Sequence, residues 1–527
     1  MRKTTLAAAI GCVLAAGPAA AVQFDFNHYW TFSHTAGNGS AALTAEIVAY
    51  DSHNARLWVA GPSGVDILDP LTRSLASSID TLPFGETNSV AVSHGLAAIA
   101  IADSIKTNPG TVRFYDAASY AFTTSVGVGA LPDMVTFTPD GSRVLTANEG
   151  EPNSYGQPDS IDPDGTVSII DTTTFSVDTV GFGGFTQAAI EAAGGRVFGP
   201  GASVAQDLEP EYVAVAPDGS YAWVTLQEAN ALARIDLNAQ ANPSPAGATP
   251  VVTTIKGLGY KDHSLPGNAL DPSDRDVDGG DPEIDIQNFP VKGMYMPDAI
   301  GTYETGGNTY FVIANEGDAR EYTGFEEEAR IKELNWDPAS PVASLLADED
   351  LGRLTVTTTL GDVDNDGDYD EAYAFGGRSF SILDADGNLV FDSGDLLEQI
   401  IADEFPALWQ EGRSDNKGPE PEGIALAEVA GRDLLFLGLE RTNATMVFDI
   451  SNPVNALFLA VLETAGDVGP EGLTVFEMAG EVFVAIANEV SGTTTLYNVS
   501  AVPVPAALPL AASALGMLGA WRRRRVV

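Results

Sequence analysis

The stretch EPEYVAVAPDGSYAWVTLQEANALARIDL, residues 209–237, is the unit whose copies organise the rest of the chain. Its segments 212–216 and 221–226 are rich in Val, Tyr and Trp, which is typical of half-buried β-strands. The PDG sequence between them favours a tight turn, because Pro fixes φ and Gly accepts a positive φ. Two antiparallel strands joined by such a turn bring their outer ends together, so we expect Glu211 and Glu228 at the same end of a hairpin.

This unit of acid, strand, turn, strand and second acid recurs along the chain. The first acids are Asp133, Glu211, Asp298, Glu422 and Glu471, and the second acids are Glu149, Glu228, Glu316, Glu440 and Glu489. They are separated by 16, 17, 18, 18 and 18 residues, and weaker copies begin at Glu46 and Asn88. Seven copies of one β unit predict an all-β, seven-bladed β-propeller. The alternative, one large β-sandwich with chance similarity between its parts, does not account for seven aligned copies.

The two ends of the propeller are predicted to share one blade. The last repeat offers three strands, at residues 473–477, 482–487 and 493–499, and lacks a fourth. The aromatic, alternating segment 24–32 supplies a strand that would complete this blade and close the ring, which removes open sheet edges. We therefore divide the chain into a leader (1–21), a propeller (22–500) and a tail (501–527).

Insertions are predicted to gather on one face of the propeller. They occupy residues 150–165, 181–208, 257–296, 317–376 and 397–419. Each follows the second or the fourth strand of a blade, and both positions open onto the face that carries the acids. Long loops on one face of a rigid scaffold usually carry function, so we expect the functional site there.

The composition restricts the partners. The chain has 73 acidic and 26 basic residues among 527, a formal net charge of −47. Such a surface repels nucleic acid and anionic membranes and attracts cations.

Residues 1–21 combine a basic start, an apolar middle and a small-residue end, which predicts a signal peptide handled by signal peptidase. The only cysteine, Cys12, lies within it, so no disulfide is expected in the exported protein.

Two insertions contain patterns of calcium-binding loops. The first has carboxylates at loop positions 1, 3, 5 and 12, which are Asp274, Asp276, Asp278 and Asp285. The second has them at positions 1, 3, 5, 7 and 9, which are Asp362, Asp364, Asp366, Asp368 and Asp370, but it has Tyr373 at position 12. Alternate carboxylates on a turning loop converge on one point, as the oxygen-rich shell of Ca²⁺ requires. The alternative is a solvated acidic turn in a very acidic chain.

The ring of acids at the opening of the propeller needs neutralisation, because so many carboxylates around one opening repel one another. Arg320, Arg330, Lys417 and Arg441 lie close in sequence to these acids. They are either ion-pair partners of the acids or, together with a metal, an anion site for phosphate or carboxylate. No nucleophile elbow or zinc-protease motif occurs in the sequence, so the catalytic residues, if any, are unknown.

Several strings resemble the choice-of-anchor I family of secreted bacterial propeller proteins, which is similar to animal mesenchyme-specific cell-surface glycoproteins. They include TANEGEPNSYG, MYMPDAIG, IANEGDAREYTGF, NKGPEPEGIA and LGLERTNATMVFDIS, in order, over residues 40 to 500. Members are sometimes labelled alkaline-phosphatase-like or phytase-like, so the resemblance implies a surface propeller and suggests a metal-dependent phosphatase.

The tail VPVPAALPLAASALGMLGAWRRRRVV, residues 502–527, resembles a PEP-CTERM sorting signal. It combines a Pro-rich motif, an apolar run at residues 506–521 and Arg522–Arg525. The resemblance implies cleavage by an exosortase-like transpeptidase during export, although Val504 stands where Glu is usual. The alternative is a permanent membrane anchor, which would be the protein's contact with the membrane.

Three functions remain open from the sequence. The first is an exported, surface-associated, calcium-binding propeller that binds a ligand, partner or extracellular polymer through its acidic loop face. The second is a metal-dependent phosphoester hydrolase, with a metal-bound water as nucleophile. The third is a structural matrix component without a site, which the ring of acids argues against.

Overall fold

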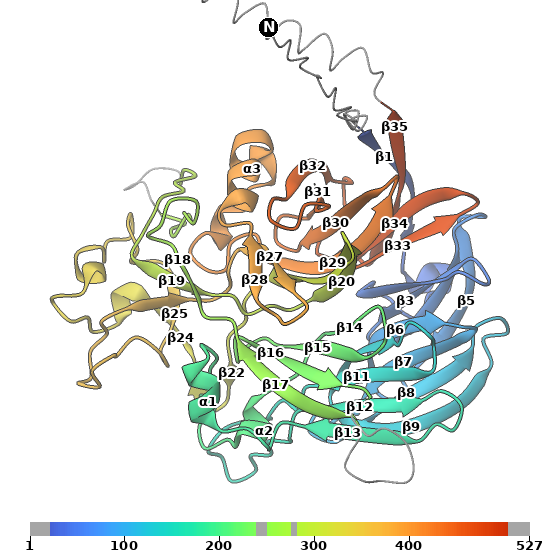
Figure 1. The fold of residues 1–527 in the computed structure, drawn as a ribbon, viewed down its shortest axis with the longest axis horizontal. Coiled ribbons are helices and arrows are strands. Elements are labelled where there is room, and N and C mark those ends of the chain that lie inside the picture. Colours follow the sequence, from blue (N-terminus) through green and yellow to red (C-terminus); the bar gives the residue numbers. More distant parts are fainter. Residues whose placement is uncertain (1–21, 239–249, 276–281, 504–527) are drawn as a thin grey trace, which may run out of the picture.

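The computed structural model describes residues 22–238, 250–275 and 282–503, and these form a β-propeller (Figure 1). In this described part of the chain, seven four-stranded antiparallel sheets make up the ring. In the first six sheets the strands follow the sequence order from the centre outward, and in the last sheet the outermost strand comes from the N-terminus. The first four sheets consist of β2 (Ile47–Asp51), β3 (Arg56–Gly61), β4 (Gly64–Asp69) and β5 (Ser74–Asp80); β6 (Glu86–Ser93), β7 (Leu96–Ala102), β8 (Pro109–Asp116) and β9 (Phe122–Ala130); β10 (Pro132–Phe137), β11 (Arg143–Asn148), β12 (Thr166–Asp171) and β13 (Val177–Gly181); and β14 (Val213–Val215), β15 (Tyr221–Leu226), β16 (Ala231–Asp236) and β17 (Val251–Gly257).

The other three sheets follow the same plan. They consist of β20 (Ile300–Thr305), β21 (Asn308–Asn315), β27 (Ser379–Asp384) and β28 (Leu389–Asp392); β29 (Pro421–Val429), β30 (Arg432–Leu439), β31 (Ala444–Asp449) and β32 (Leu457–Leu462); and β33 (Pro470–Met478), β34 (Glu481–Asn488), β35 (Thr493–Pro503) and β1 (Val22–Ser33). The innermost strands contact one another in a circle, in the order β2, β6, β10, β14, β20, β29, β33 and back to β2.

The N-terminal strand β1 pairs antiparallel with β35, as the closure predicted from the sequence requires. Val22 lies opposite Pro503 and Ser33 lies opposite Thr493. Just beyond β1, the buried His34 joins the last sheet to the first: its Nδ1 is 2.7 Å from Asp66 Oδ2 on β4, and its Nε2 is 2.8 Å from Thr494 Oγ1 on β35. This His34 cluster (His34, Asp66 and Thr494) therefore spans the seam of the ring.

The hairpin predicted within residues 209–237 is formed. Val213–Val215 pairs with Tyr221–Leu226, and the turn between them contains Gly219 at a φ of +68°. The Asp218 side chain accepts a hydrogen bond from the Ser220 amide at 2.9 Å, which stabilises the turn.

The core lies between neighbouring sheets rather than at the centre of the ring. Each pair of adjacent sheets shares one apolar cluster; for example, Phe380 and Phe448 pack between the fifth and sixth sheets, with ring centroids 5.0 Å apart. Because the sheets bury apolar side chains on both faces, the ends of the innermost strands remain free to carry polar groups toward the central axis.

The insertions form a subdomain beside the fifth sheet, at the left in Figure 1. Its sheet has the order β18 (Tyr260–Asp262), β19 (Val291–Met294), β26 (Ala372–Ala374), β25 (Thr355–Thr357) and β24 (Glu328–Arg330), and a hairpin pairs β22 (Glu321–Tyr322) with β23 (Phe325–Glu326). Helices α1 (Gln187–Ala192) and α2 (Val204–Asp207) lie in the loop before β14, and α3 (Leu396–Glu404) lies in the loop before β29. Short 3₁₀ turns occur at Ala36–Asn38, Ile331–Glu333, Pro341–Ser344, Pro406–Leu408 and Glu411–Arg413. All of these insertions leave the ring at the predicted positions, after a second or a fourth strand.

Candidate functional site, an acidic central cavity

The repeated acids occupy equivalent places in each sheet. The first acid stands at or just before the start of the innermost strand, and the second follows the end of the next strand, so both lie at the same end of the hairpin. The Asn before the second acid holds this strand end: Asn315 Nδ2 donates to Ser379 Oγ at 3.0 Å and to Ser381 Oγ at 2.8 Å. Both hydroxyls belong to the third strand, so the Asn315 side chain ties the end of the second strand to the third just before Glu316.

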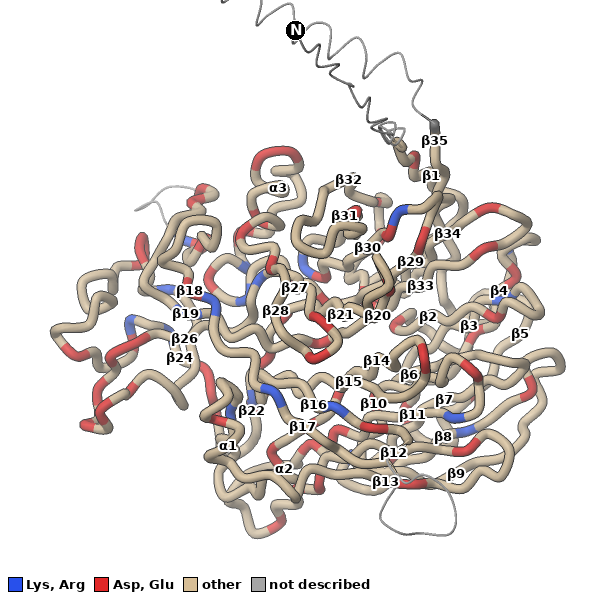
Figure 2. The backbone as a smooth tube through the Cα atoms, in the orientation of Figure 1, with Lys and Arg blue, Asp and Glu red and all other residues tan. Residues whose placement is uncertain are grey.

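A cavity of about 250 Å³ lies where these acids meet. Eight predicted acids line it: Asp133, Glu149, Glu211, Glu228, Asp298, Glu316, Glu422 and Glu471. Glu151 and Asp318 line it as well, which brings the carboxylates to ten among the described lining residues. In the part of the chain that the structure describes, no Lys, Arg or His is a lining residue of this cavity. The cavity is therefore a concentrated site of negative charge, in keeping with the excess of acidic positions along the tube in Figure 2.

Burial and mutual repulsion raise the pKa values of the eight repeated acids that line the cavity. Burial, with the Glu151 carboxylate next, raises the pKa of Asp133 to about 7. Burial raises the pKa of Glu228 to about 7 as well. For Glu211, burial and then the carboxylates of Glu228 and Asp298 raise the pKa well above its ordinary value. A group of carboxyls with such shifts is typical of a functional site that binds protons or cations.

Two of the ten repeated acids lie outside the lining of the cavity. Glu440 is buried, and its Oε1 is 2.8 Å from Arg441 Nη1. Burial raises the pKa of Glu440 to about 7, while Arg441 lowers it. Glu489 lies near Glu46, whose pKa is raised to about 8 by burial first and by the Glu489 carboxylate next. The ring of acids predicted from the sequence is thus larger than the cavity itself.

The predicted basic partners do not all reach the ring. Lys417 Nζ lies 3.5 Å from Glu316 Oε1, 3.5 Å from an oxygen of Asp318 and 3.6 Å from Glu420 Oε2, so it neutralises one edge of the cavity.

Two of the other three basic side chains, Arg320 and Arg330, pair with acids outside the repeated set. The fully buried Arg320 pairs with Asp207 and lies 3.1 Å from Glu209 Oε1, neither of which is a repeated acid. Arg330 lies 2.9 Å from Asp415. Of the four predicted bases, Lys417 and Arg441 are therefore the two that pair with repeated acids. An anion site built from a metal and several bases would have one of these bases, Lys417, at the edge of the cavity.

Three carboxylates of the cavity lie close enough to share one ion. Ligand oxygens of Asp298, Glu316 and Glu422 are within 4.8 Å of one another. A second group, Glu316, Glu420 and Glu440, meets the same criterion, but Lys417 and Arg441 lie against it.

The second predicted calcium loop brings together only some of its carboxylates. Oxygens of Asp362, Asp364 and Asp370 lie within 4.8 Å of one another, whereas Asp368 groups with Asp337 and Asp370. Asp366 belongs to neither group, and its amide donates to Asp362 Oδ1 at 3.1 Å.

The first predicted loop is described only in part. Asp276 and Asp278 lie outside the described residues. Asp274 Oδ1 is 2.7 Å from Arg353 Nε, and Asp285 accepts hydrogen bonds from Gln287. The side chain at position 1 of this loop is thus engaged in an ion pair.

Two lining carboxylates escaped the sequence analysis. Glu151 and Asp318 each stand two residues after a second acid, in the strings ANEGE and ANEGD. The recurrence of an acid at that position is the signal that could have found them. Glu151 is also held from outside the ring, since Lys106 Nζ lies 2.6 Å from its Oε2 and Tyr322 donates to its Oε1 at 2.7 Å.

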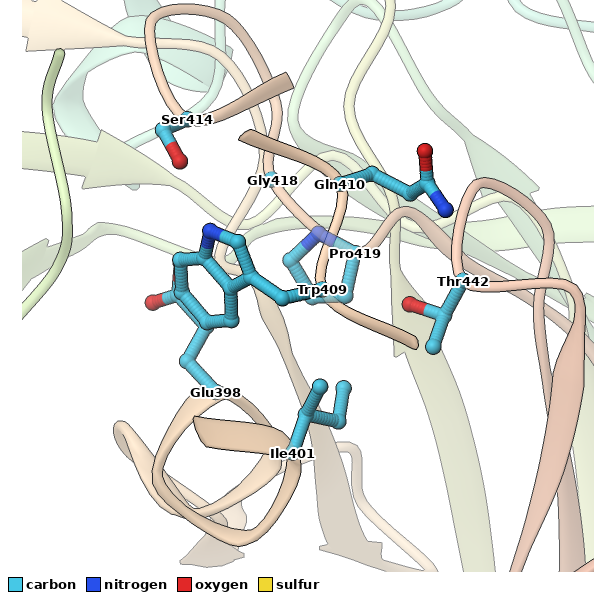
Figure 3. Close-up of a pocket in the computed structure, with 8 residues that line it drawn as sticks. All are labelled: Glu398, Ile401, Trp409, Gln410, Ser414, Gly418, Pro419 and Thr442. Atoms are coloured by element: carbon cyan, nitrogen blue, oxygen red, sulfur yellow. The ribbon is translucent and has the colours of Figure 1, made fainter. Parts of the chain in front are cut away.

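A second pocket, shown in Figure 3, is too small for a ligand larger than water. It lies where Trp409 covers Glu398 and Ile401 of α3, and its volume is about 20 Å³. That volume suits a single water molecule, which Glu398 Oε2 and Ser414 Oγ could bind, because both atoms are buried without a hydrogen-bond partner.

The fold and the site define a β-propeller with an acidic central cavity and insertions on one face. The chain belongs to the choice-of-anchor I family, whose domain model matches residues 46–453. It is 33% identical over 133 residues to Gigasin-3a of Magallana gigas, which covers 23% of this chain and 46% of that protein. It is 28% identical over 262 residues to the mesenchyme-specific cell surface glycoprotein of Strongylocentrotus purpuratus, which covers 41% of this chain and 32% of that protein. The chain thus spans less than half the length of these curated relatives.

Two solved structures that are similar to this chain over most of its length are distant from it in sequence. The hydrazine synthase of Kuenenia stuttgartiensis matches with a TM-score of 0.46 and 13% identity, over 88% of this chain and 96% of that one. The Cps50 (Swd1) β-propeller domain of Myceliophteria thermophila matches with a TM-score of 0.45 and 9% identity, over 90% and 100%. Nothing about the function of this chain follows from these TM-scores and identities.

Family membership and the cell-surface relative fit a surface-associated or extracellular propeller. The predicted signal peptide, residues 1–21, and the sorting tail from residue 504 onward lie outside the described residues. Within the described ranges, no helix has the length and apolar character needed to cross a bilayer.

Proposed function

We propose that this protein is an exported, surface-associated propeller that binds calcium in its acidic central cavity and binds a ligand or partner through the surrounding loop face. The observation that carries the proposal is the cavity of about 250 Å³ with ten carboxylates among its described lining residues. Ionised carboxylates this close together destabilise the folded state unless cations or protons neutralise them. In a calcium-containing extracellular medium, bound Ca²⁺ would do so.

The geometry favours binding over phosphoester hydrolysis. A phosphoryl group brings negative charge, and a site for it needs basic side chains as well as metal. Lys417, the base at the edge of the cavity, is already surrounded by three carboxylates. A cation, or a neutral ligand held through a cation, therefore suits this cavity better than a phosphate ester.

Calcium titration of the mature protein, stripped of metal by a chelator, tests the proposal. The double variant Glu211→Gln/Glu228→Gln removes two carboxylates that line the cavity, and it should bind Ca²⁺ at least about tenfold more weakly than the parent, a loss of about 1.4 kcal/mol. Glu404→Gln, at an exposed position of α3, is the matched control and should leave the affinity unchanged. A double variant that binds Ca²⁺ as tightly as the parent would show that the cavity is not the calcium site.

Export and sorting require a separate test. The intact mass of the exported protein should correspond to loss of residues 1–21 and, if the tail is processed, of everything after about Pro505. Arg522–Arg525 still attached to the exported protein would refute processing and favour the permanent anchor.

A further inference from the structure

We infer that Asp298, Glu316 and Glu422 hold one divalent cation of the calcium class inside the cavity. This inference rests on the proposed function, because it names the place and the ligands of the ion in that cavity. It goes further in choosing, from the ten lining carboxylates, the three that contact the ion directly, and in predicting that Glu149 contributes little to affinity.

The three carboxylates come from two neighbouring sheets. Asp298 precedes β20, Glu316 follows β21 of the same sheet, and Glu422 lies near the start of β29 in the next sheet. Since β20 contacts β29, the rigid innermost strands place the three side chains together without help from the long insertions. Sites built on strands hold their geometry better than sites built on loops.

The distances suit calcium. Oxygens bound to one Ca²⁺ lie about 2.3–2.6 Å from it, so two of them can be at most about 5 Å apart. The three carboxylate oxygens lie within 4.8 Å of one another, which satisfies this limit. Ca²⁺ takes about 6–8 oxygen ligands, and the remaining positions open into a polar cavity that has room for water. Mg²⁺ demands a stricter octahedral shell and should bind more weakly.

Unpartnered buried oxygens provide an independent sign that this cavity holds a ligand. Glu211 and Glu228 line the same cavity and are only 7% and 6% exposed. Each has an Oε2 atom that is buried and has no hydrogen-bond partner. Because a buried carboxylate oxygen without a partner is costly, a hydrated ion in the cavity would supply the missing interactions.

The neighbouring group of acids does not fit an ion equally well. Glu316, Glu420 and Glu440 have Lys417 Nζ and the Arg441 guanidinium against them, and these side chains already provide positive charge. Glu316 belongs to both groups, and its Oε2 accepts a hydrogen bond from Gln227 Nε2 at 2.9 Å. That bond orients Glu316 between the ion-paired group on one side and the proposed cation site on the other.

The test is calorimetric titration of Ca²⁺ into the metal-free mature protein. Asp298→Asn and Glu422→Gln keep the size of each side chain and remove its charge, and each should weaken Ca²⁺ binding by at least about tenfold. Glu149→Gln, in the same cavity but outside the three ligands, should change the affinity by less than about threefold, and Glu404→Gln, at an exposed position of α3, is the matched control and should leave it unchanged.

The outcomes separate this inference from the proposed function. If Glu149→Gln weakens binding as much as Asp298→Asn, the cavity binds calcium diffusely, so the proposed function stands and this site is wrong. If neither these variants nor the double variant of Glu211 and Glu228 changes the affinity, both ideas fail. If a variant does not fold, crystals of the parent soaked in Mn²⁺ decide the matter: an anomalous peak between the three carboxylates supports the site, and a peak elsewhere in the cavity overturns it.

Discussion

Replacing His34 by alanine should open the seam of the ring. His34 donates or accepts two buried hydrogen bonds, of 2.7 Å with Asp66 and 2.8 Å with Thr494, that connect the last sheet to the first. A hydrogen bond to a charged group contributes about 1.5–3 kcal/mol and a neutral one about 0.5–1.5 kcal/mol. With the cavity that the missing ring leaves, we expect the free energy of unfolding to fall by about 3–5 kcal/mol.

The loss should depend on pH with a defined sign. Burial alone would raise the pKa of Asp66, but hydrogen bonds from His34, Ser40 and Ser78 hold it below its ordinary value. A carboxyl whose folded-state pKa is lowered stabilises the fold above its unfolded pKa, near 4, and loses that contribution as the pH falls through the folded value. The difference between the parent and His34→Ala should therefore be largest near pH 7 and shrink below about pH 4.

Urea unfolding followed by tryptophan fluorescence at pH 7 and pH 3.5 measures both effects. His28→Ala is the matched control, because the exposed His28 lies on the adjoining strand β1 and bonds only the Thr31 hydroxyl among the hydrogen bonds described for its side chain. It should cost less than about 1 kcal/mol. A loss for His34→Ala no larger than that of the control, or a loss that acid does not reduce, would refute the role assigned to the His34 cluster.

Three further predictions concern charge. The metal-free protein should lose stability as the pH rises from about 5.5 to 8.5, because the pKa values of Glu46 and Asp133, about 8 and about 7, are raised by burial first and by neighbouring carboxylates next. For a carboxyl whose pKa is raised by folding, the free energy of unfolding falls by about 1.4 kcal/mol for each pH unit between the unfolded and the folded pKa, so a fall on the order of 5 kcal/mol is expected from these two groups in thermal or urea melts, and a flat profile would contradict it. If the second acidic loop binds calcium, Asp364→Ala should remove part of the rise in melting temperature that Ca²⁺ gives after chelation, and an unchanged rise would mark the loop as a solvated turn. Arg320→Ala should cost about 3–5 kcal/mol, because it leaves two buried carboxylates unpaired, whereas Arg275→Ala at an exposed position should cost less than about 0.5 kcal/mol; similar urea midpoints for the two variants would disprove this.

The repeated hairpins could be predicted because their signals are local. The turn at Gly219 and the two acids that flank its strands lie within one short stretch, and the spacing recurs along the chain. Closure by residues 24–32 followed from the missing fourth strand of the last repeat, and β1 indeed pairs with β35. The predicted strands differ from the observed ones mainly by a few residues at each end.

The insertion subdomain could not be predicted in the same way. Its strands β18, β25 and β26 have three residues each, too few for a periodic pattern, and β19 pairs in parallel with β26 from another insertion. The partner of Arg320, Asp207, lies 113 residues earlier in the chain. Proximity in sequence to the repeated acids therefore misassigned Arg320, because the packing of one insertion against another decides its partners.

The same distinction, between signals that are local in the sequence and contacts that depend on tertiary packing, applies to the cavity. Its eight predicted lining acids follow from hairpin geometry, which places both acids of a unit at one strand end. Whether a given carboxylate then faces the axis depends on its own neighbours, and Glu440 turns to Arg441 instead. The orientation of each carboxylate depends on its neighbouring side chains, so the spacing of the acids along the sequence does not predict it.

The pairing of β1 with β35 also has a mechanical consequence. Val22 and Pro503 are register partners, so the two described ends of the chain leave the ring side by side. In the order β1, β35, β34 and β33, strand β35 is hydrogen-bonded on both edges. A pull along the axis of β35, applied at Pro503, would therefore load both ladders of hydrogen bonds in shear at once, and a tether attached there would hold the ring by a strand that is bonded on both edges.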